Sequence, residues 1–128
     1  MAEGEREASR QVEKGTKFET AICGYLSRVL GETIERRAKH GTNDMGDISG
    51  VFLGGKPVVI EAKDRAKLAF PQWLDEAEVE RGNAGAEYGV VVAHRKGKGA
   101  SSMGEQYVVM TLETFAAIIA GGHGNLEE

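Results

Sequence analysis

Two short segments joined by glycines constrain the fold of this chain more than any other part of its sequence. The first runs from Asp47 to Leu53 and the second from Pro57 to Lys63, with Gly54-Gly55-Lys56 between them. Side chains alternate between the faces of a strand, and opposed residues of an antiparallel pair share a face. A two-residue Gly54-Gly55 turn sets Asp47 opposite Ala62 and mixes an acidic face with an apolar one. A three-residue loop or a bulge aligns both faces, so the sequence predicts a hairpin with one of these features.

The other segments predict one α/β domain in which a central mixed sheet of five strands is flanked by helices. Apolar residues spaced three and four apart indicate a first helix that ends at Gly31. Pro71 suits the first turn of a second helix, and Thr111 caps a third. The expected helices cover 14–30, 71–81 and the residues after 111, and the expected strands cover 33–38, 47–53, 57–63, 88–93 and 107–110.

The predicted domain spans 14–120, with polar, flexible tails at 1–13 and 121–128, and the first tail is expected to be frayed or helical only in part. The residues of the last helix that we expect to face the core are Leu112, Phe115, Ala116 and Ile119.

Composition limits the class of protein but does not identify its partners. The chain has 128 residues and a net charge of −4, which argues mildly against binding to nucleic acid, but its basic residues are concentrated in a few segments. No apolar run approaches the roughly 20 residues of a membrane span. The N-terminal residues are charged, unlike those of a signal peptide, and Cys23 is the single cysteine. We therefore expect a cytoplasmic protein.

Charged side chains follow the most apolar part of the hairpin. The triplet Glu61-Ala62-Lys63 comes directly after Val58-Val59-Ile60, and Asp47 lies fourteen residues before Glu61. Residues i and i+2 of a strand share a face, so Glu61 and Lys63 project together. Charges at the end of a buried strand are costly unless they are paired or bound to a metal. Two carboxylates and an ammonium group fit metal-assisted phosphodiester cleavage, because carboxylates hold hard divalent cations and lysine can stabilise the reacting phosphate.

The order of motifs along residues 14–98 resembles that of a nuclease family. The matching segments are Gly15-Thr16-Lys17-Phe18-Glu19, Arg36-Arg37, Gly41-Thr42, Gly46-Asp47, Glu61-Ala62-Lys63, Gln72 and Tyr88 to Arg95. Together they resemble the PD-(D/E)xK nuclease superfamily, and more closely the archaeal-type Holliday junction resolvases and their phage relatives. Gly46 stands where these proteins usually have a proline before the aspartate. The resemblance implies a restriction-endonuclease-like fold.

The same resemblance implies roles for the acidic residues. Asp47 and Glu61 would bind Mg²⁺ or Mn²⁺, helped by the carbonyl of Ala62. Glu19 would reach the metal from the first helix, directly or through water.

The resemblance also implies an activity and a partner. Lys63 would position or activate the attacking water and stabilise the charge that develops on the phosphate, and Gln72 would orient Lys63 or a water. The implied reaction is hydrolysis of four-way DNA junctions to a 5′-phosphate and a 3′-hydroxyl, carried out by a homodimer. For a phage-encoded protein the location would be the host cytoplasm.

Basic residues near these motifs are candidates for contacts with DNA, because phosphate contacts dominate the affinity for nucleic acid. They are Arg36, Arg37, Lys39, Arg95, Lys96 and Lys98, together with Thr42 in a loop.

Each of these interpretations has a structural alternative. Asp47 can be a turn residue, and Glu61 with Lys63 can form an exposed ion pair worth about 0–1 kcal/mol. Glu19, Gln72 and the basic residues can be ordinary solvent-facing side chains. At the level of function, the alternatives are a restriction-like or repair nuclease and a non-catalytic module that binds branched DNA.

Overall fold

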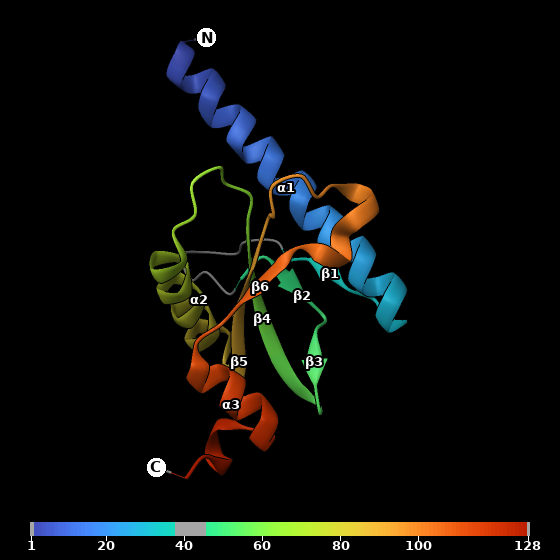
Figure 1. Ribbon diagram of the computed structural model, residues 1–128, viewed down its shortest axis with the longest axis vertical. Helices are drawn as coiled ribbons and strands as arrows, with labels where there is room; N and C mark the ends of the chain where they lie inside the picture. The colour runs from blue at the N-terminus through green and yellow to red at the C-terminus, as the bar shows by residue number, and fades with distance from the viewer. Residues whose placement is uncertain (1, 38–45, 128) are drawn as a thin grey trace.

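The computed structural model describes residues 2–37 and 46–127, which form an α/β arrangement around one mixed sheet (Figure 1). The helices are α1 (Glu3–Leu30), α2 (Phe70–Ala84) and α3 (Leu112–Ala120), with short 3₁₀ helices at Ala100–Glu105 and His123–Asn125. The strands are β1 (Glu35–Arg36), β2 (Ile48–Ser49), β3 (Phe52–Leu53), β4 (Lys56–Lys63), β5 (Tyr88–Ala93) and β6 (Tyr107–Val109).

Within the described residues the sheet has six strands. Five of them follow the order β1-β2-β4-β5-β6, and β3, which is off this path, pairs with β4. β4 and β5 are parallel, and the other pairs are antiparallel. α2 is the crossover between the two parallel strands. The α/β class and the mixed sheet are confirmed, but the predicted number of five strands is wrong, because the segment 47–53 forms two short strands instead of one.

The break between β2 and β3 comes from a bulge at Gly50. A two-residue Gly54-Gly55 turn pairs Leu53 with Lys56, yet Ile48 pairs with Ile60, which is one residue out of step with that turn. Gly50 lies in this interval with φ of +94°. Of the two features that the sequence allowed, the structure therefore has the bulge.

Gly50 also meets a close neighbour. A Cβ atom added there would lie 2.6 Å from the carbonyl oxygen of Thr33. We expect Gly50→Ala to lower the free energy of unfolding by about 2 kcal/mol or more, from the positive φ and the clash combined. Urea denaturation measures this value. Gly24→Ala is the control, because the site on α1 is open and alanine favours a helix by about 0.5–1 kcal/mol. Equal stability of the two variants would contradict the prediction.

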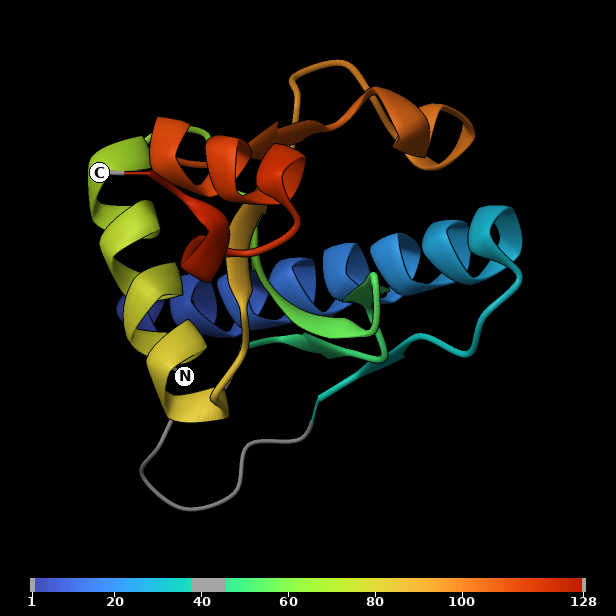
Figure 2. The same ribbon diagram turned by 90° about the horizontal axis from the view of Figure 1, so that it is seen from below.

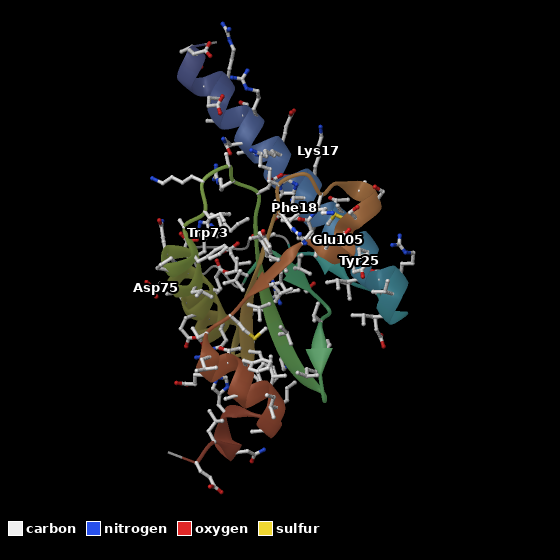
Figure 3. The ribbon with its side chains drawn as sticks, viewed as in Figure 1. Lys17, Phe18, Tyr25, Trp73, Asp75 and Glu105 are labelled. Carbon is white, nitrogen blue, oxygen red and sulfur yellow. The ribbon has the colours of Figure 1, made fainter. Side chains whose placement is uncertain are left out.

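α1 covers one face of the sheet and α2 covers the other (Figures 1 and 2). Phe18 of α1 and Trp73 of α2 belong to separate buried clusters (Figure 3). The residues of the α1 cluster are Phe18, Ile22, Cys23, Ile34, Ile48, Ile60, Val90 and Val92, and those of the α2 cluster are Trp73, Ala77, Val91 and Ala93. Within the described residues, no helix is both long enough and apolar enough to cross a membrane.

The first helix is longer than its apolar pattern indicated. It begins at Glu3, so the predicted start at residue 14 is wrong. Its first three turns are polar and exposed, and ion pairs along the helix stabilise them, including Arg10 with Glu7 at 2.8 Å. Polar helix formers of this kind give no apolar periodicity, and therefore they gave no signal for a helix.

The last helix faces the core with residues other than those predicted. Thr111 caps it as predicted, because its hydroxyl oxygen accepts from the Thr114 N–H at 3.1 Å. Thr114 and Ala117 are buried, whereas Leu112 is 83% exposed and Ile119 is 72% exposed. Phe115 is exposed as well, and Ala116 is half-buried. The predicted inward face is wrong because α3 is apolar on most sides, so spacing alone did not select the face that packs.

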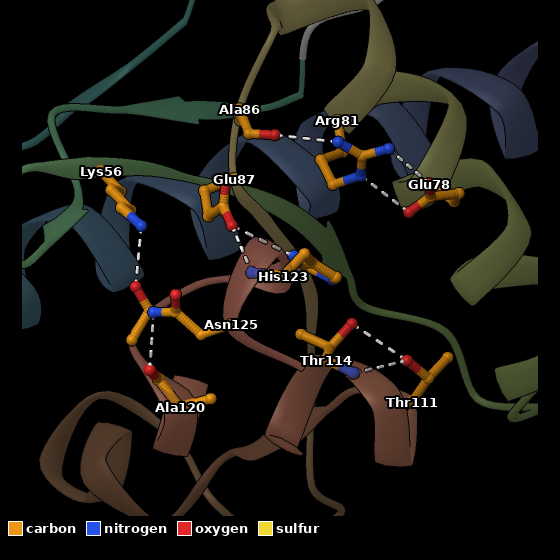
Figure 4. A network of polar contacts seen from close by, with 11 residues as sticks. Lys56, Glu78, Arg81, Ala86, Glu87, Thr111, Thr114, Ala120, His123 and Asn125 are labelled. Atoms are coloured by element: carbon orange, nitrogen blue, oxygen red, sulfur yellow. Dashed lines mark hydrogen bonds and ion pairs between the residues drawn. The ribbon is translucent and has the colours of Figure 1, made fainter. Parts of the chain in front are cut away.

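The residues after α3 return to the body of the domain (Figure 4). The Lys56 ammonium donates to the carbonyl of Gly121 at 2.7 Å, and the His123 N–H donates to the Glu87 carboxylate at 2.6 Å. These contacts hold the segment after α3 beside the start of β4, so it does not extend away from the domain.

Candidate active site

A cavity of about 240 Å³ lies at the carboxyl end of β4, against the first half of α1. It brings together five residues that the sequence singled out, and these are Glu19, Asp47, Glu61, Ala62 and Lys63. Three of them follow one another on β4, Asp47 comes from the segment before β2, and Glu19 comes from α1. Gln72 is outside this lining.

Backbone contacts fix the position of Asp47. Its N–H donates to the Ile60 carbonyl at 3.0 Å, and its Oδ2 accepts from the Ala62 N–H at 2.9 Å. The preceding Gly46 has φ of +93°, which proline cannot adopt. A Cβ atom at Gly46 would also lie 2.8 Å from a methyl group of Val59. The glycine before the aspartate therefore allows this segment to approach β4 closely.

Glu61 lies among other carboxylates in a buried environment. It is 6% exposed, and Glu80 of α2, which the sequence analysis did not single out, is 3% exposed. Burial, followed by hydrogen bonding and charge repulsion with Asp47 and Glu80, raises the pKa of Glu61 to about 12. In the absence of a cation, this arrangement favours the protonated, neutral form of Glu61.

Lys63 forms a close ion pair with another residue of α2. Its Nζ lies 2.6 Å from Oε2 of Glu76. Burial lowers the pKa of Lys63, but the hydrogen bond to Glu76 and the nearby acidic residues outweigh it, so the net shift is upward. Lys63 therefore stays positively charged at neutral pH, which suits stabilisation of negative charge better than proton abstraction.

Neither of the two acidic residues of α2 that reach this face of β4 was predicted from the sequence. Glu76 and Glu80 are four residues apart, and Gln72 continues the same stripe one turn earlier. Gln72 donates to Glu76 at 3.3 Å, so its connection to Lys63 runs through Glu76. The spacing of four was visible in the sequence, but nothing in the sequence placed this stripe against β4.

Glu19 is connected to one of the basic residues proposed for DNA binding. The Nε atom of Arg36 lies 3.5 Å from Oε2 of Glu19. In this arrangement the positive charge of Arg36 balances the negative charge of Glu19. Its neighbour Arg37 donates its backbone N–H to the carbonyl of Asp47 at 2.8 Å.

The other basic candidates lie in the segment after β5. Arg95 lies over the ring of Tyr107, 5.8 Å from its centroid. Lys96 lines a second cavity, and Lys98 pairs with Glu105 at 3.2 Å. Lys39 and Thr42 fall outside the described residues.

The donors in the candidate active-site cavity fit a hard divalent cation. They are carboxylate oxygens crowded closely enough to disfavour ionisation of one of them, and a cation relieves that repulsion. No preformed group of three acidic, histidine or cysteine side chains that could hold a metal is present in residues 2–37 and 46–127. Mg²⁺ does not require one, since it is commonly held by one or two carboxylates together with water and substrate phosphates.

Comparisons of this chain with protein-family models, with curated proteins and with solved structures found no match.

Proposed function

We propose that this protein is a metal-dependent DNA endonuclease of the PD-(D/E)xK type, with a restriction-endonuclease-like fold, and that it hydrolyses four-way junctions. The observation that carries the proposal is the placement of Asp47, Glu61 and Lys63 around one cavity at the end of β4. The high pKa of Glu61 supports a site that is completed by a cation, because the carboxylates have too little positive charge around them without one.

The residues around the cavity have distinct roles in this proposal. Asp47 and Glu61 would hold Mg²⁺ or Mn²⁺, with the Ala62 carbonyl as a further oxygen donor and with Glu19 reaching the ion directly or through water. The chemistry that such an ion supplies is Lewis-acid activation of a water and of the scissile phosphate. Lys63, held by Glu76, would stabilise the negative charge that develops on the phosphate during attack.

Basic residues around the site would hold the DNA backbone. Arg36, Arg37, Arg95, Lys96 and Lys98 remain candidates for phosphate contacts, together with Lys39 and Thr42. Recognition of this kind reads the shape of a branched molecule more than its sequence.

A homodimer would place two such sites on the two opposed strands of a junction. The exposed apolar residues of α3 and of the neighbouring edge strand β6 support self-association, because large exposed apolar patches mark interaction surfaces. They are Val108, Leu112, Phe115 and Ile119. A second copy is the partner that the proposed reaction requires, since a junction offers two equivalent cleavage positions related by a two-fold axis.

We expect Phe115→Glu to convert the protein from a dimer to a monomer in sedimentation velocity at micromolar concentration. A carboxylate at this position would have to be buried without a partner, which costs several kcal/mol. The fold should survive, because Phe115 is 49% exposed. Phe115→Leu is the matched control and should remain a dimer. A monomeric wild-type protein, or a dimeric Phe115→Glu variant, would contradict this interface.

The activity is tested with an end-labelled four-way junction in Mg²⁺, beside linear duplexes with the same arm sequences. The proposal predicts paired, symmetric nicks in the junction alone, and no nicks with Asp47→Asn. Cleavage of the linear duplexes as well would favour a restriction-like or repair nuclease. Tight binding of the junction without cleavage would favour a non-catalytic module.

A further inference from the structure

A second cavity lies beside the active site, where two parallel strands end. β4 ends at Lys63 and β5 ends at Ala93, and these two residues are paired in the sheet. The His94 N–H donates to the Lys63 carbonyl at 2.9 Å, so the two strands end at the same level of the sheet. Both segments rise toward α1 from this end of the sheet (Figure 1). The crevice outside the carboxyl ends of parallel strands is the usual place for ligands in open α/β sheets.

The cavity has a volume of about 430 Å³ and shares lining residues with the active-site cavity. Asp64 and Arg65 directly follow Lys63 and line both cavities. A ligand in this cavity would therefore lie next to the phosphate that is cut. Its volume falls in the range of roughly 300–1,000 Å³ that is typical of pockets for small organic ligands.

The charge of the lining favours an anion. Lys14 of α1, Arg65 after β4 and Lys96 after β5 contribute three cationic side chains, against the single carboxylate of Asp64. Asp64 is already shared between Lys14 and His94, each with a nitrogen 3.4 Å from its Oδ1. This positive charge is local, because the whole chain carries a net charge of −4.

The same cavity has apolar and aromatic walls. Leu68 and Tyr107 line it, and both are exposed. Arg95 lies over the Tyr107 ring, which places a further positive charge beside that ring. An aromatic ring with cations around it suits a base that stacks while its phosphate is neutralised.

We infer that this cavity is the subsite for one nucleotide that flanks the scissile phosphate, with its base unstacked from the duplex and placed against Tyr107. The inference rests on the proposed nuclease function and narrows its substrate to DNA in which this nucleotide is unpaired or easily unpaired. The branch point of a junction supplies such a nucleotide, whereas a continuous duplex must first be distorted.

The cleavage test combines a substrate change with a protein change. Junctions carry an abasic residue on the 5′ or the 3′ side of the cut, and they are compared with the intact junction. Removal of the base on one side should slow cleavage by the wild-type protein about tenfold, which is within the range expected for stacking of one base. Tyr107→Leu should slow cleavage of the intact junction by a similar factor and be insensitive to the abasic residue, while Tyr107→Phe should match the wild type. Equal rates on all three substrates would overturn the inference.

If neither the wild-type protein nor the variants cut any substrate, that result would count against the proposed function alone. A binding measurement then tests the subsite separately. The ¹⁵N-labelled full chain is titrated with the dinucleotide pTpT without metal. We expect amide shifts at Ala66, Leu68 and Lys96, retained in Tyr107→Phe and lost in Tyr107→Leu. Absence of these shifts in the wild-type protein would overturn the subsite.

Discussion

Replacement of Lys63 by methionine is expected to lower the rate of junction cleavage by about 10³-fold and to leave junction binding and metal binding in place. The reason is electrostatic, because loss of one group aimed at the developing negative charge typically costs about 10²–10³-fold in rate. The environment keeps Lys63 positively charged, with Glu76 2.6 Å from its ammonium group and with its pKa shifted upward. Single-turnover cleavage and calorimetric metal titration measure the two effects separately.

Lys63→Arg is the matched control, because it keeps a positive charge beside Glu76. We expect it to recover part of the lost rate. If Lys63→Met cleaved within about tenfold of the wild-type rate, the assigned role of Lys63 in charge stabilisation would be wrong.

Replacement of Glu61 by glutamine is expected to abolish cleavage and, in the metal-free protein, to change how stability depends on pH. The pKa of Glu61 is about 12 in the folded protein, against an ordinary value of 4.5. The folded state therefore binds more protons than the unfolded state between these two values, so the stability from this group is complete below about pH 4.5 and is lost as pH rises toward 12. Its slope is at most about −1.4 kcal/mol per pH unit.

Glutamine cannot lose a proton, so the variant should lack this contribution to the slope. Urea denaturation in EDTA at about pH 5 and about pH 8 measures it, and the stability of Glu61→Gln relative to the wild type should increase between the two. Glu13→Gln, at an exposed position of α1, is the control and should follow the wild type. A variant that loses stability with pH as steeply as the wild type would show that Glu61 is ionised in the metal-free fold.

Much of the fold could be predicted from local sequence signals. β5 has the boundaries that its β-branched run indicated, and Thr111 caps α3 as expected. Parity between the segments on either side of Gly54-Gly55 required either a longer loop or a bulge, and Gly50 provides the bulge. These features depend on residues that are close together in the chain, and therefore they could be predicted from a single sequence.

The remaining features either lack a local apolar signal or depend on tertiary packing. The polar start of α1 shows no apolar period, and α3 is apolar on too many sides for spacing to select its buried face. The candidate site likewise has residues that could be predicted from the sequence and residues that could not. Asp47, Glu61 and Lys63 could be predicted. Glu76 and Glu80 could not, because their importance comes from the packing of α2 against β4.

The proposed function depends on the carboxylates at the end of β4 forming a metal site, as opposed to a structural cluster of protonated acids. Calorimetric titration of the metal-free protein with Mn²⁺ tests it most directly, with Asp47→Asn as the paired variant. We expect a saturable heat in the wild-type protein that is lost in Asp47→Asn, although both proteins are folded. A folded wild-type protein that gives no heat of binding, or an equal heat in the two proteins, would contradict it.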